Sequence, residues 1–390
     1  MKKFLLVLLG IILLSACSIA ESTETPRLIN YNHSVNQPWL KKLQQLNQGK
    51  AVKFRILQLG DSHTASDFFS GELRRKLQQH WGDAGIGWIY PNRVRGQVLE
   101  RVKYSDNQAI SLTSLRDKDQ VEFPLGGITA LSGNQDNHYS VTISPTKEDN
   151  QLKQITFSLR PLLVQQPLSI IDGKGSKFKI KPEQSGNWQY IQVEGKLPVT
   201  YSSNEGNLWQ FGSINIENQS SGIVLSAMGI NGSQLTEFKK WRENWTEDLA
   251  QTQADLIILA YGTNESLNQN LDLTNTEKAW RELIKEIRQT LPDAGILVIS
   301  APETLQKTQS SRQRCGVRTV SLDRIQQMQK RLAKEQKLLY WSWQAAMGGK
   351  CSMNKWIKQG LARQDGVHFT LKGYQKTADI LATQLIKLAK

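Results

Sequence analysis

Apolar and polar positions follow two different patterns along this chain. In the first pattern, short apolar runs alternate with amphipathic segments that carry an apolar residue every three or four positions. The apolar runs predict strands at 51–59, 222–228, 255–260, 295–300 and 338–341, and the amphipathic segments predict helices at 66–81, 234–249, 277–291, 322–332 and 371–388. This alternation favours an α/β domain with a mostly parallel sheet that helices cover on both faces.

Residues 99–221 follow the second pattern. Helical periodicity is absent there, and Gly- and Asn-containing turns separate short strand-like runs at 155–159, 177–181, 188–193 and 213–216. We therefore predict an inserted β-sandwich at 99–221, which divides the α/β domain into a first part at 51–98 and a second part at 222–390. Residues 17–50 are expected to form a tether and an N-terminal segment with a helix near 38–46.

The N-terminus has the features of an export signal. Lys2 and Lys3 precede an apolar run at 4–14, which is too short to cross a bilayer but suits a signal peptide. The sequence Leu14-Ser15-Ala16-Cys17 resembles a bacterial lipobox, which implies cleavage before Cys17 and lipidation of its thiol. We predict a lipoprotein signal peptide at 1–16 and a lipid-anchored periplasmic protein. Ser18 replaces the aspartate typical of inner-membrane retention, which favours the outer membrane; an ordinary cleaved signal peptide is the alternative.

Composition and charge exclude some classes of protein, among them one that crosses a membrane several times. The 390 residues are 39% hydrophobic, enough for a large core, and no internal apolar stretch reaches the ~20 residues of a membrane span. Of the net charge of +14, most comes from residues 301–390, with 17 Lys and Arg against five Asp and Glu. This excess suits an anionic polymer of the cell envelope, or simply well-solvated helix faces. Export makes nucleic acid an unsuitable partner.

Two cysteines remain once Cys17 is assigned to lipidation. Cys315 and Cys351 form an even pair in an oxidising compartment, which predicts a disulfide. Two separate buried thiols are the alternative.

Ser62 is the first candidate for chemistry, in the sequence Gly60-Asp61-Ser62-His63-Thr64. It follows the first predicted strand, at the edge of the sheet where open α/β folds bind ligands. A serine nucleophile needs a base, and the base needs an orienting carboxylate. His368, with Asp365 three positions before it, meets both needs. His63 is a poor base for Ser62, because neighbouring side chains usually diverge.

Two further loops follow predicted strands and could supply an oxyanion hole. The N–H groups of Ser62 and Gly232 and the side-chain amide of Asn264 could donate to a tetrahedral oxyanion. Each loop taken alone is also explained by ordinary turn chemistry, since Gly and Asn are common turn residues. The order Ser, Gly, Asn and Asp-His in four loops favours an active site.

With these residues the chain resembles the SGNH (GDSL-like) hydrolase superfamily, whose letters fall on Ser62, Gly232, Asn264 and His368. The insertion and the ending Asp365-Gly366-Val367-His368 most resemble those of periplasmic peptidoglycan O-acetylesterases. The resemblance implies a three-layer α/β/α domain interrupted by a sandwich similar to a carbohydrate-binding module. It implies hydrolysis of the 6-O-acetyl ester of N-acetylmuramic acid through an acyl-serine. Ser62 is then the nucleophile, His368 the base and Asp365 its orienter, while Ser62, Gly232 and Asn264 form the oxyanion hole. No metal or organic cofactor is implied.

The expected partners are O-acetylated peptidoglycan or a related glycan, and a membrane reached through the lipid anchor. Three alternatives remain: another exported esterase of the superfamily that acts on lipids or other acetylated sugars, a peptidoglycan O-acetyltransferase with the same triad, and a non-catalytic glycan-binding lipoprotein. Several aromatic residues of the insert could stack on sugar rings or fill its core: Trp188, Tyr190, Tyr201, Trp209 and Phe211.

Overall fold

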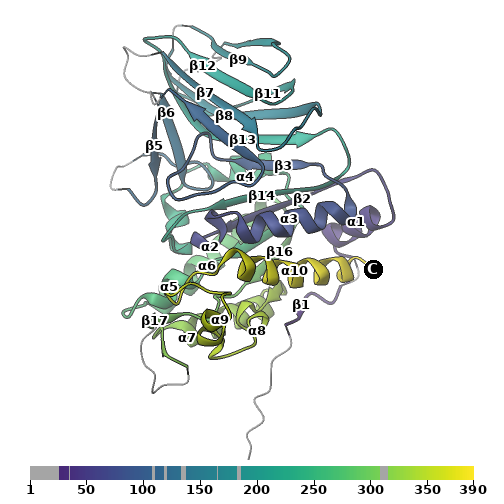
Figure 1. Ribbon diagram of the computed structural model, residues 1–390, viewed down its shortest axis with the longest axis vertical. Helices are drawn as coiled ribbons and strands as arrows, with labels where there is room; N and C mark the ends of the chain where they lie inside the picture. The colour runs from purple at the N-terminus through teal and green to yellow at the C-terminus, as the bar shows by residue number, and fades with distance from the viewer. Residues whose placement is uncertain are drawn as a thin grey trace, which may run out of the picture.

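A six-stranded sheet forms the centre of the molecule (Figure 1). The computed structural model describes residues 26–34, 36–107, 110–117, 121–132, 138–164, 166–181, 186–307 and 315–390, so that Cys17 lies outside the described residues. The strand order is β1-β19-β16-β15-β2-β14; β1 runs antiparallel to β19 and all other neighbours are parallel. The strands are β1 (Leu28–Asn30), β2 (Lys53–Gly60), β14 (Gly222–Gly229), β15 (Leu256–Ala260), β16 (Gly295–Ile299) and β19 (Leu339–Trp341).

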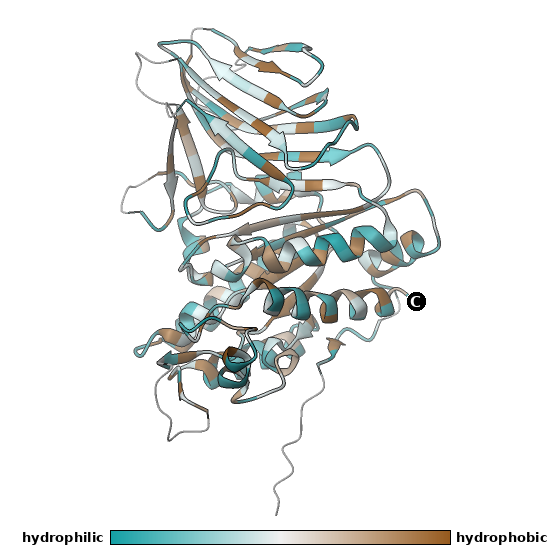
Figure 2. Ribbon diagram, viewed as in Figure 1, coloured by the Kyte–Doolittle hydropathy of each residue, from teal (hydrophilic) through white to brown (hydrophobic). Residues whose placement is uncertain are grey.

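Helices cover both faces of this sheet. One face packs against α1 (Pro38–Asn47), α3 (Phe68–Trp81) and α10 (Leu371–Leu388), and the other against α4 (Trp245–Thr252), α6 (Leu273–Thr290) and α7 (Leu322–Glu335). Along β2, Phe54 and Ile56 enter the first layer, while Leu57 and Leu59 enter the second. Because the strands are buried on both faces, their sequences are continuous apolar runs. Figure 2 shows the hydrophobic colouring along these strands. The predicted α/β/α arrangement is confirmed.

Two antiparallel sheets lie beyond β14 and face each other across a separate core (Figure 1). One has the order β10-β9-β12-β7-β4 and the other β11-β8-β13-β6-β5, with β3 pairing with β13. Tyr139 and Tyr201 from the first sheet and Phe157 and Phe211 from the second meet in this core. The strands are β3 (Gly85–Ile89), β4 (Val102–Asp106), β5 (Ile110–Ser114), β6 (Ile128–Ser132), β7 (Tyr139–Pro145), β8 (Lys153–Leu163), β9 (Leu168–Ile171), β10 (Lys177–Ile180), β11 (Gln189–Gly195), β12 (Val199–Ser203) and β13 (Leu208–Asn218). The inserted β-sandwich expected from the sequence is present.

The boundaries of the parts remain a prediction. β3 lies within residues 51–98, the range predicted for the first part of the hydrolase domain, yet it hydrogen-bonds with β13 of the sandwich. The segment 28–30, predicted as part of a tether, forms the edge strand β1 of the central sheet.

The helix predicted at 234–249 is broken. A 3-10 helix, η1, covers only Leu235–Lys240, and α4 begins only at Trp245. Between them, the N–H of Arg242 donates to the carbonyl oxygen of Phe123, and the backbone of Phe123 forms a β-bridge with Trp241. The backbone at 241–242 thus pairs with the insert instead of continuing the helix, a long-range contact that local periodicity does not reveal.

The aromatic residues of the insert divide into two groups. Tyr201, Trp209 and Phe211 are fully buried in the sandwich core, which excludes stacking on a sugar. Tyr190 and Trp188 instead face the hydrolase part, where the hydroxyl of Tyr190 donates to Asp248 and the guanidinium of Arg242 lies 5.8 Å from the ring centroid of Trp188.

Candidate active site

Three neighbouring strands of the central sheet, β14, β2 and β15, end at the same edge, and a loop follows each of them. In the strand register, Gly60 of β2 stands beside Gly229 of β14 and Ala260 of β15. A Cβ atom on Gly60 would lie 2.1 Å from Oγ1 of Thr64, and one on Gly229 would lie 2.4 Å from the backbone nitrogen of Ala65. The short helix α2 (Ser62–Ala65) can therefore pack on the strand ends only because both positions are glycine.

Ser62, His368 and Asp365 form one hydrogen-bonded chain. Ser62 begins α2, while Asp365 and His368 lie in the loop that leads into α10. Oγ of Ser62 is 3.0 Å from Nε2 of His368, and Nδ1 of His368 is 2.9 Å from Oδ2 of Asp365. An ionised carboxylate can only accept, so Nδ1 carries the proton and Nε2 is left to accept from the Ser62 hydroxyl.

Asp365 is fixed by its own loop. Its Oδ1 accepts hydrogen bonds of 2.9 Å from the backbone N–H groups of Val367 and His368. Partial burial raises the pKa of this carboxyl, but these N–H donors and the His368 side chain outweigh it and hold the pKa below its usual value. Asp365 thus remains ionised around neutral pH, as an orienting carboxylate must.

His63 points away from the serine into the core. Its Nδ1 lies 2.9 Å from the hydroxyl of Tyr374, and its ring lies 5.5 Å from the ring of His368 between centroids. Burial lowers the pKa of His63 to about 3, so the ring stays neutral. His63 packs beside His368, and its position is not suited to a base for Ser62.

The loops of Gly232 and Asn264 are joined directly. Nδ2 of Asn264 donates to the carbonyl oxygen of Ser233 over 2.8 Å, and the N–H of Ile230 donates to the carbonyl oxygen of Gly60. Gly232 adopts a φ of +77°, which favours glycine. These bonds hold the two loops and the end of β2 together, which is the arrangement that a shared oxyanion site requires.

Two buried carboxyl groups, those of Asp61 and Glu265, lie close to these loops. They are not among the site residues predicted from the sequence. Asp61 accepts from the N–H of His63 over 3.0 Å, and Glu265 accepts from the N–H of Leu235 over 2.8 Å. Burial raises the pKa of Asp61 to about 6 and that of Glu265 to about 7. In the sequence, Asp61 directly precedes Ser62 and Glu265 directly follows Asn264. This adjacency to candidate site residues is the signal by which the two carboxyl groups could have been found.

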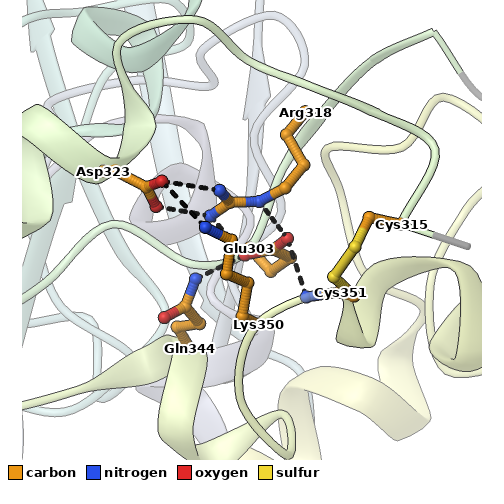
Figure 3. Close-up of a disulfide and its surroundings, with 7 residues drawn as sticks. All are labelled: Glu303, Cys315, Arg318, Asp323, Gln344, Lys350 and Cys351. Atoms are coloured by element: carbon orange, nitrogen blue, oxygen red, sulfur yellow. Dashed lines mark hydrogen bonds and ion pairs between the residues drawn. A yellow bond between two sulfur atoms is a disulfide. The ribbon is translucent and has the colours of Figure 1, made fainter.

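The predicted disulfide joins Cys315 to Cys351 (Figure 3). Beside it, the fully buried Glu303 accepts from the guanidinium of Arg318, from the side-chain amide of Gln344 and from the backbone N–H of Cys351. Two residues further on, the N–H of Leu305 in β17 (Leu305–Lys307) donates to the carbonyl oxygen of Gly366, between Asp365 and His368. The cross-linked region therefore supports the loop that carries Asp365 and His368.

Within the described ranges, no group of three or more His, Cys, Asp or Glu side chains is arranged to hold a metal ion. No helix in the described part of the chain is long and apolar enough to cross a membrane.

Comparisons with known proteins agree with this geometry. The family described as "Peptidoglycan O-acetylesterase, N-terminal" matches residues 84–200, and the "GDSL-like Lipase/Acylhydrolase family" matches residues 209–376. A solved structure titled "Peptidoglycan O-acetylesterase in action, 5 min" is 44% identical, with a TM-score of 0.85 over 93% of this chain and 99% of its own. No curated protein matches the chain.

Two other solved structures are far less similar. A family two carbohydrate esterase from Clostridium thermocellum is 12% identical with a TM-score of 0.30, over 70% of this chain and 97% of its own. A GDSL-like lipase from Bacteroides thetaiotaomicron is 18% identical with a TM-score of 0.31, over 42% of this chain and 76% of its own. Family membership is decided by the structure that is 44% identical and by its near-complete coverage. The chain belongs to the peptidoglycan O-acetylesterase family of GDSL-like (SGNH) hydrolases.

Proposed function

We propose that this chain is a serine esterase that removes O-acetyl groups from peptidoglycan, at the 6-hydroxyl of N-acetylmuramic acid, through an acetyl-serine intermediate. One observation carries the proposal. A chain 44% identical over 93% of its length to a peptidoglycan O-acetylesterase holds Ser62, His368 and Asp365 in a single hydrogen-bonded chain of 3.0 and 2.9 Å.

Acylation begins at Ser62. As Oγ attacks the carbonyl carbon of the acetyl ester, Nε2 of His368 takes the hydroxyl proton. The negative charge that develops on the carbonyl oxygen is met by the N–H groups of Ser62 and Gly232 and by the amide of Asn264. The tetrahedral intermediate collapses when the sugar oxygen leaves, and His368 returns the proton to it.

Deacylation repeats these steps with water. His368 takes a proton from a water molecule, the resulting hydroxide adds to the acetyl carbonyl, and acetate leaves with Ser62 reprotonated. Asp365 stabilises the imidazolium form of His368 in both halves because it remains ionised. Its role is to fix the ring and its tautomer, and it takes no proton itself.

The same proposal locates the enzyme in the cell envelope, where its substrate lies. Export through the signal at 1–16 and a lipid anchor on Cys17 would hold it in the periplasm at the outer membrane. We assign the sandwich a glycan-holding role. Binding by loops is the form consistent with its aromatic residues, because Tyr201, Trp209 and Phe211 are fully buried in its own core.

Acetate release tests the proposed function. The wild-type chain is incubated with O-acetylated peptidoglycan, with a chromogenic acetate and with a chromogenic long-chain ester of equal leaving group. Acetate release from peptidoglycan and faster turnover of the acetate than of the long-chain ester are expected. Faster turnover of the long-chain ester, or no acetate from peptidoglycan, would contradict the proposal.

A further inference from the structure

One side chain of the insert reaches the Gly232 loop of the hydrolase part. Arg116 follows β5 in a turn closed by the N–H of Asp117 donating to the carbonyl oxygen of Ser114. A Cβ atom on Gly232 would have Nε, Nη2 and Cζ of Arg116 as its nearest neighbours, at 3.7, 3.7 and 3.8 Å. The guanidinium therefore covers the glycine whose N–H we assign to the oxyanion hole.

An ion pair with Glu237 holds Arg116 in this position. Its Nη1 donates to Oε1 of Glu237 over 2.9 Å, and the same oxygen accepts from Nζ of Lys240 over 3.2 Å. Glu237 is itself fixed in η1, where its other oxygen accepts from the N–H of Gln234. One carboxylate oxygen of Glu237 thus serves two cations, Arg116 and Lys240.

The rest of the guanidinium is available to a ligand. The Arg116 side chain is 48% exposed, and among the described residues Nε and Nη2 have no hydrogen-bond partner. Nε–H and Nη2–H form one edge of the planar fork, the edge that binds a carboxylate through two parallel hydrogen bonds. In the same loop, Asn231 contacts Gly96, and Arg93 and Arg95, which are close to Gly96 in the sequence, are exposed.

We propose that Arg116 is a substrate-binding residue that takes a carboxylate of the glycan close to the ester under attack. The inference rests on the proposed function and specifies it: the substrate is an anionic, carboxylate-bearing glycan, and the insert contributes directly to its recognition. In peptidoglycan the carboxylate can come from the lactyl group of the sugar or from the attached peptide. Both present the same chemistry to a guanidinium.

A single substitution tests this better than deletion of the insert. Leu115, Phe123 and Leu125 share a hydrophobic core with Trp241 and Trp245 of the hydrolase part, so deletion would expose that core. Arg116→Gln removes the charge and the guanidinium and leaves a shorter, polar amide side chain. Lys240→Gln is the matched control, because it removes the other cation of Glu237 and leaves Gly232 covered. Thermal unfolding checks that both variants fold.

The first measurement is the KM for three acetylated glycans of equal length: muropeptides with peptides attached, the same strands freed of peptide so that the lactyl carboxylate is exposed, and neutral chitooligosaccharides. Arg116→Gln should raise KM roughly tenfold wherever the recognised carboxylate is present. The KM values for neutral glycans and for a chromogenic acetate should change much less than those for the anionic glycans. A rise limited to one of the two anionic glycans identifies the source of the carboxylate. Arg116→Lys should be intermediate, since it keeps charge but not the fork.

The second measurement does not depend on peptidoglycan being the substrate. Deacetylated muropeptides should inhibit hydrolysis of the chromogenic acetate by the wild type, and roughly tenfold more weakly in Arg116→Gln, with neutral oligosaccharides unaffected by the substitution. An equal loss on neutral and anionic compounds, the same defect in Lys240→Gln, or no change in either measurement would overturn the role of Arg116. Failure of the proposed function would appear separately, as absence of acetate release from peptidoglycan by the wild type.

Discussion

Oγ of Ser62 lies 3.0 Å from Nε2 of His368, although 306 positions separate the two residues in the chain. Replacing Ser62 with Ala removes the proposed nucleophile and should lower turnover of a chromogenic acetate by ~10⁴-fold or more. The fold should persist, because serine at the start of α2 fills little space. Ser66→Ala, directly after the end of the same helix, is the control and should stay active. Retention of more than a few per cent of activity by Ser62→Ala would show that another residue attacks the ester.

Substitution of Asn264 is expected to lower kcat, because its side-chain amide is proposed to bind the oxyanion of the tetrahedral intermediate. One amide hydrogen is used by the carbonyl oxygen of Ser233, which leaves the second for the developing oxyanion. Asn264→Ala should therefore lower kcat by roughly 10²–10³ with little change in KM. Steady-state kinetics measure both constants, and Asn268→Ala, an exposed asparagine just beyond α5 (Thr263–Leu267), is the control. A change confined to KM would instead assign Asn264 to ground-state binding.

The disulfide should contribute stability through the loop that it closes. Cys315 and Cys351 are 36 positions apart, for which the chain-entropy model gives roughly 3–4 kcal/mol. Urea unfolding should show this loss in Cys315→Ser, in Cys351→Ser and, to the same extent, in the double variant, since all three lack the same bond. A double variant that is much less stable than either single one would mean that the thiols contribute through packing. Mass mapping of the unreduced protein should find the two cysteines linked.

Glu265 should make stability depend on pH. Its pKa is raised from 4.5 to about 7 by burial, so the folded state holds a proton that the unfolded state releases at lower pH. The contribution of this bound proton to the free energy of unfolding is fully present below about pH 4.5 and is lost as the pH rises through about 7. Glu265→Gln cannot titrate, so the free energy of unfolding of the wild type relative to this variant should fall by up to roughly 3 kcal/mol between about pH 5 and about pH 8.

Urea unfolding at the two pH values measures this difference. The exposed Glu243→Gln is a suitable control and should give the same difference from wild type at both. A pH-independent difference for Glu265→Gln would mean that Glu265 is ionised in the folded protein throughout this range.

Local sequence pattern was sufficient for the elements of the central sheet. β15 and β16 are buried on both faces, so five consecutive apolar residues mark each one without help from distant parts of the chain. The candidate triad could be proposed for a similar reason. Serine follows the first strand and histidine precedes the last helix, and topology alone brings strand ends to one edge.

Features that depend on long-range contacts could not be predicted. Phe123 interrupts the helix expected at 234–249 from more than 100 positions away, and Leu28–Asn30 become a strand only because β19 offers an open edge. Arg116 carries no local signal for its place over Gly232, because an exposed arginine after a short strand has no preferred partner. The buried Asp61 and Glu265 were missed because burial of a carboxyl group depends on the surrounding fold.

Under the proposed lipidation of Cys17, the position of the edge strand β1 would limit the distance between the enzyme and the membrane. Only ten residues, 18–27, separate Cys17 from β1, and a fully extended chain of that length reaches about 35 Å. With the proposed lipid on Cys17, the hydrolase part would stay within that distance of the bilayer. β1 and β14 are the two opposite edges of the central sheet, and the sandwich lies beyond β14, at the far end of the molecule from β1 (Figure 1). The anchored enzyme would thus present its sandwich outward and deacetylate only the layer of cell wall nearest the membrane.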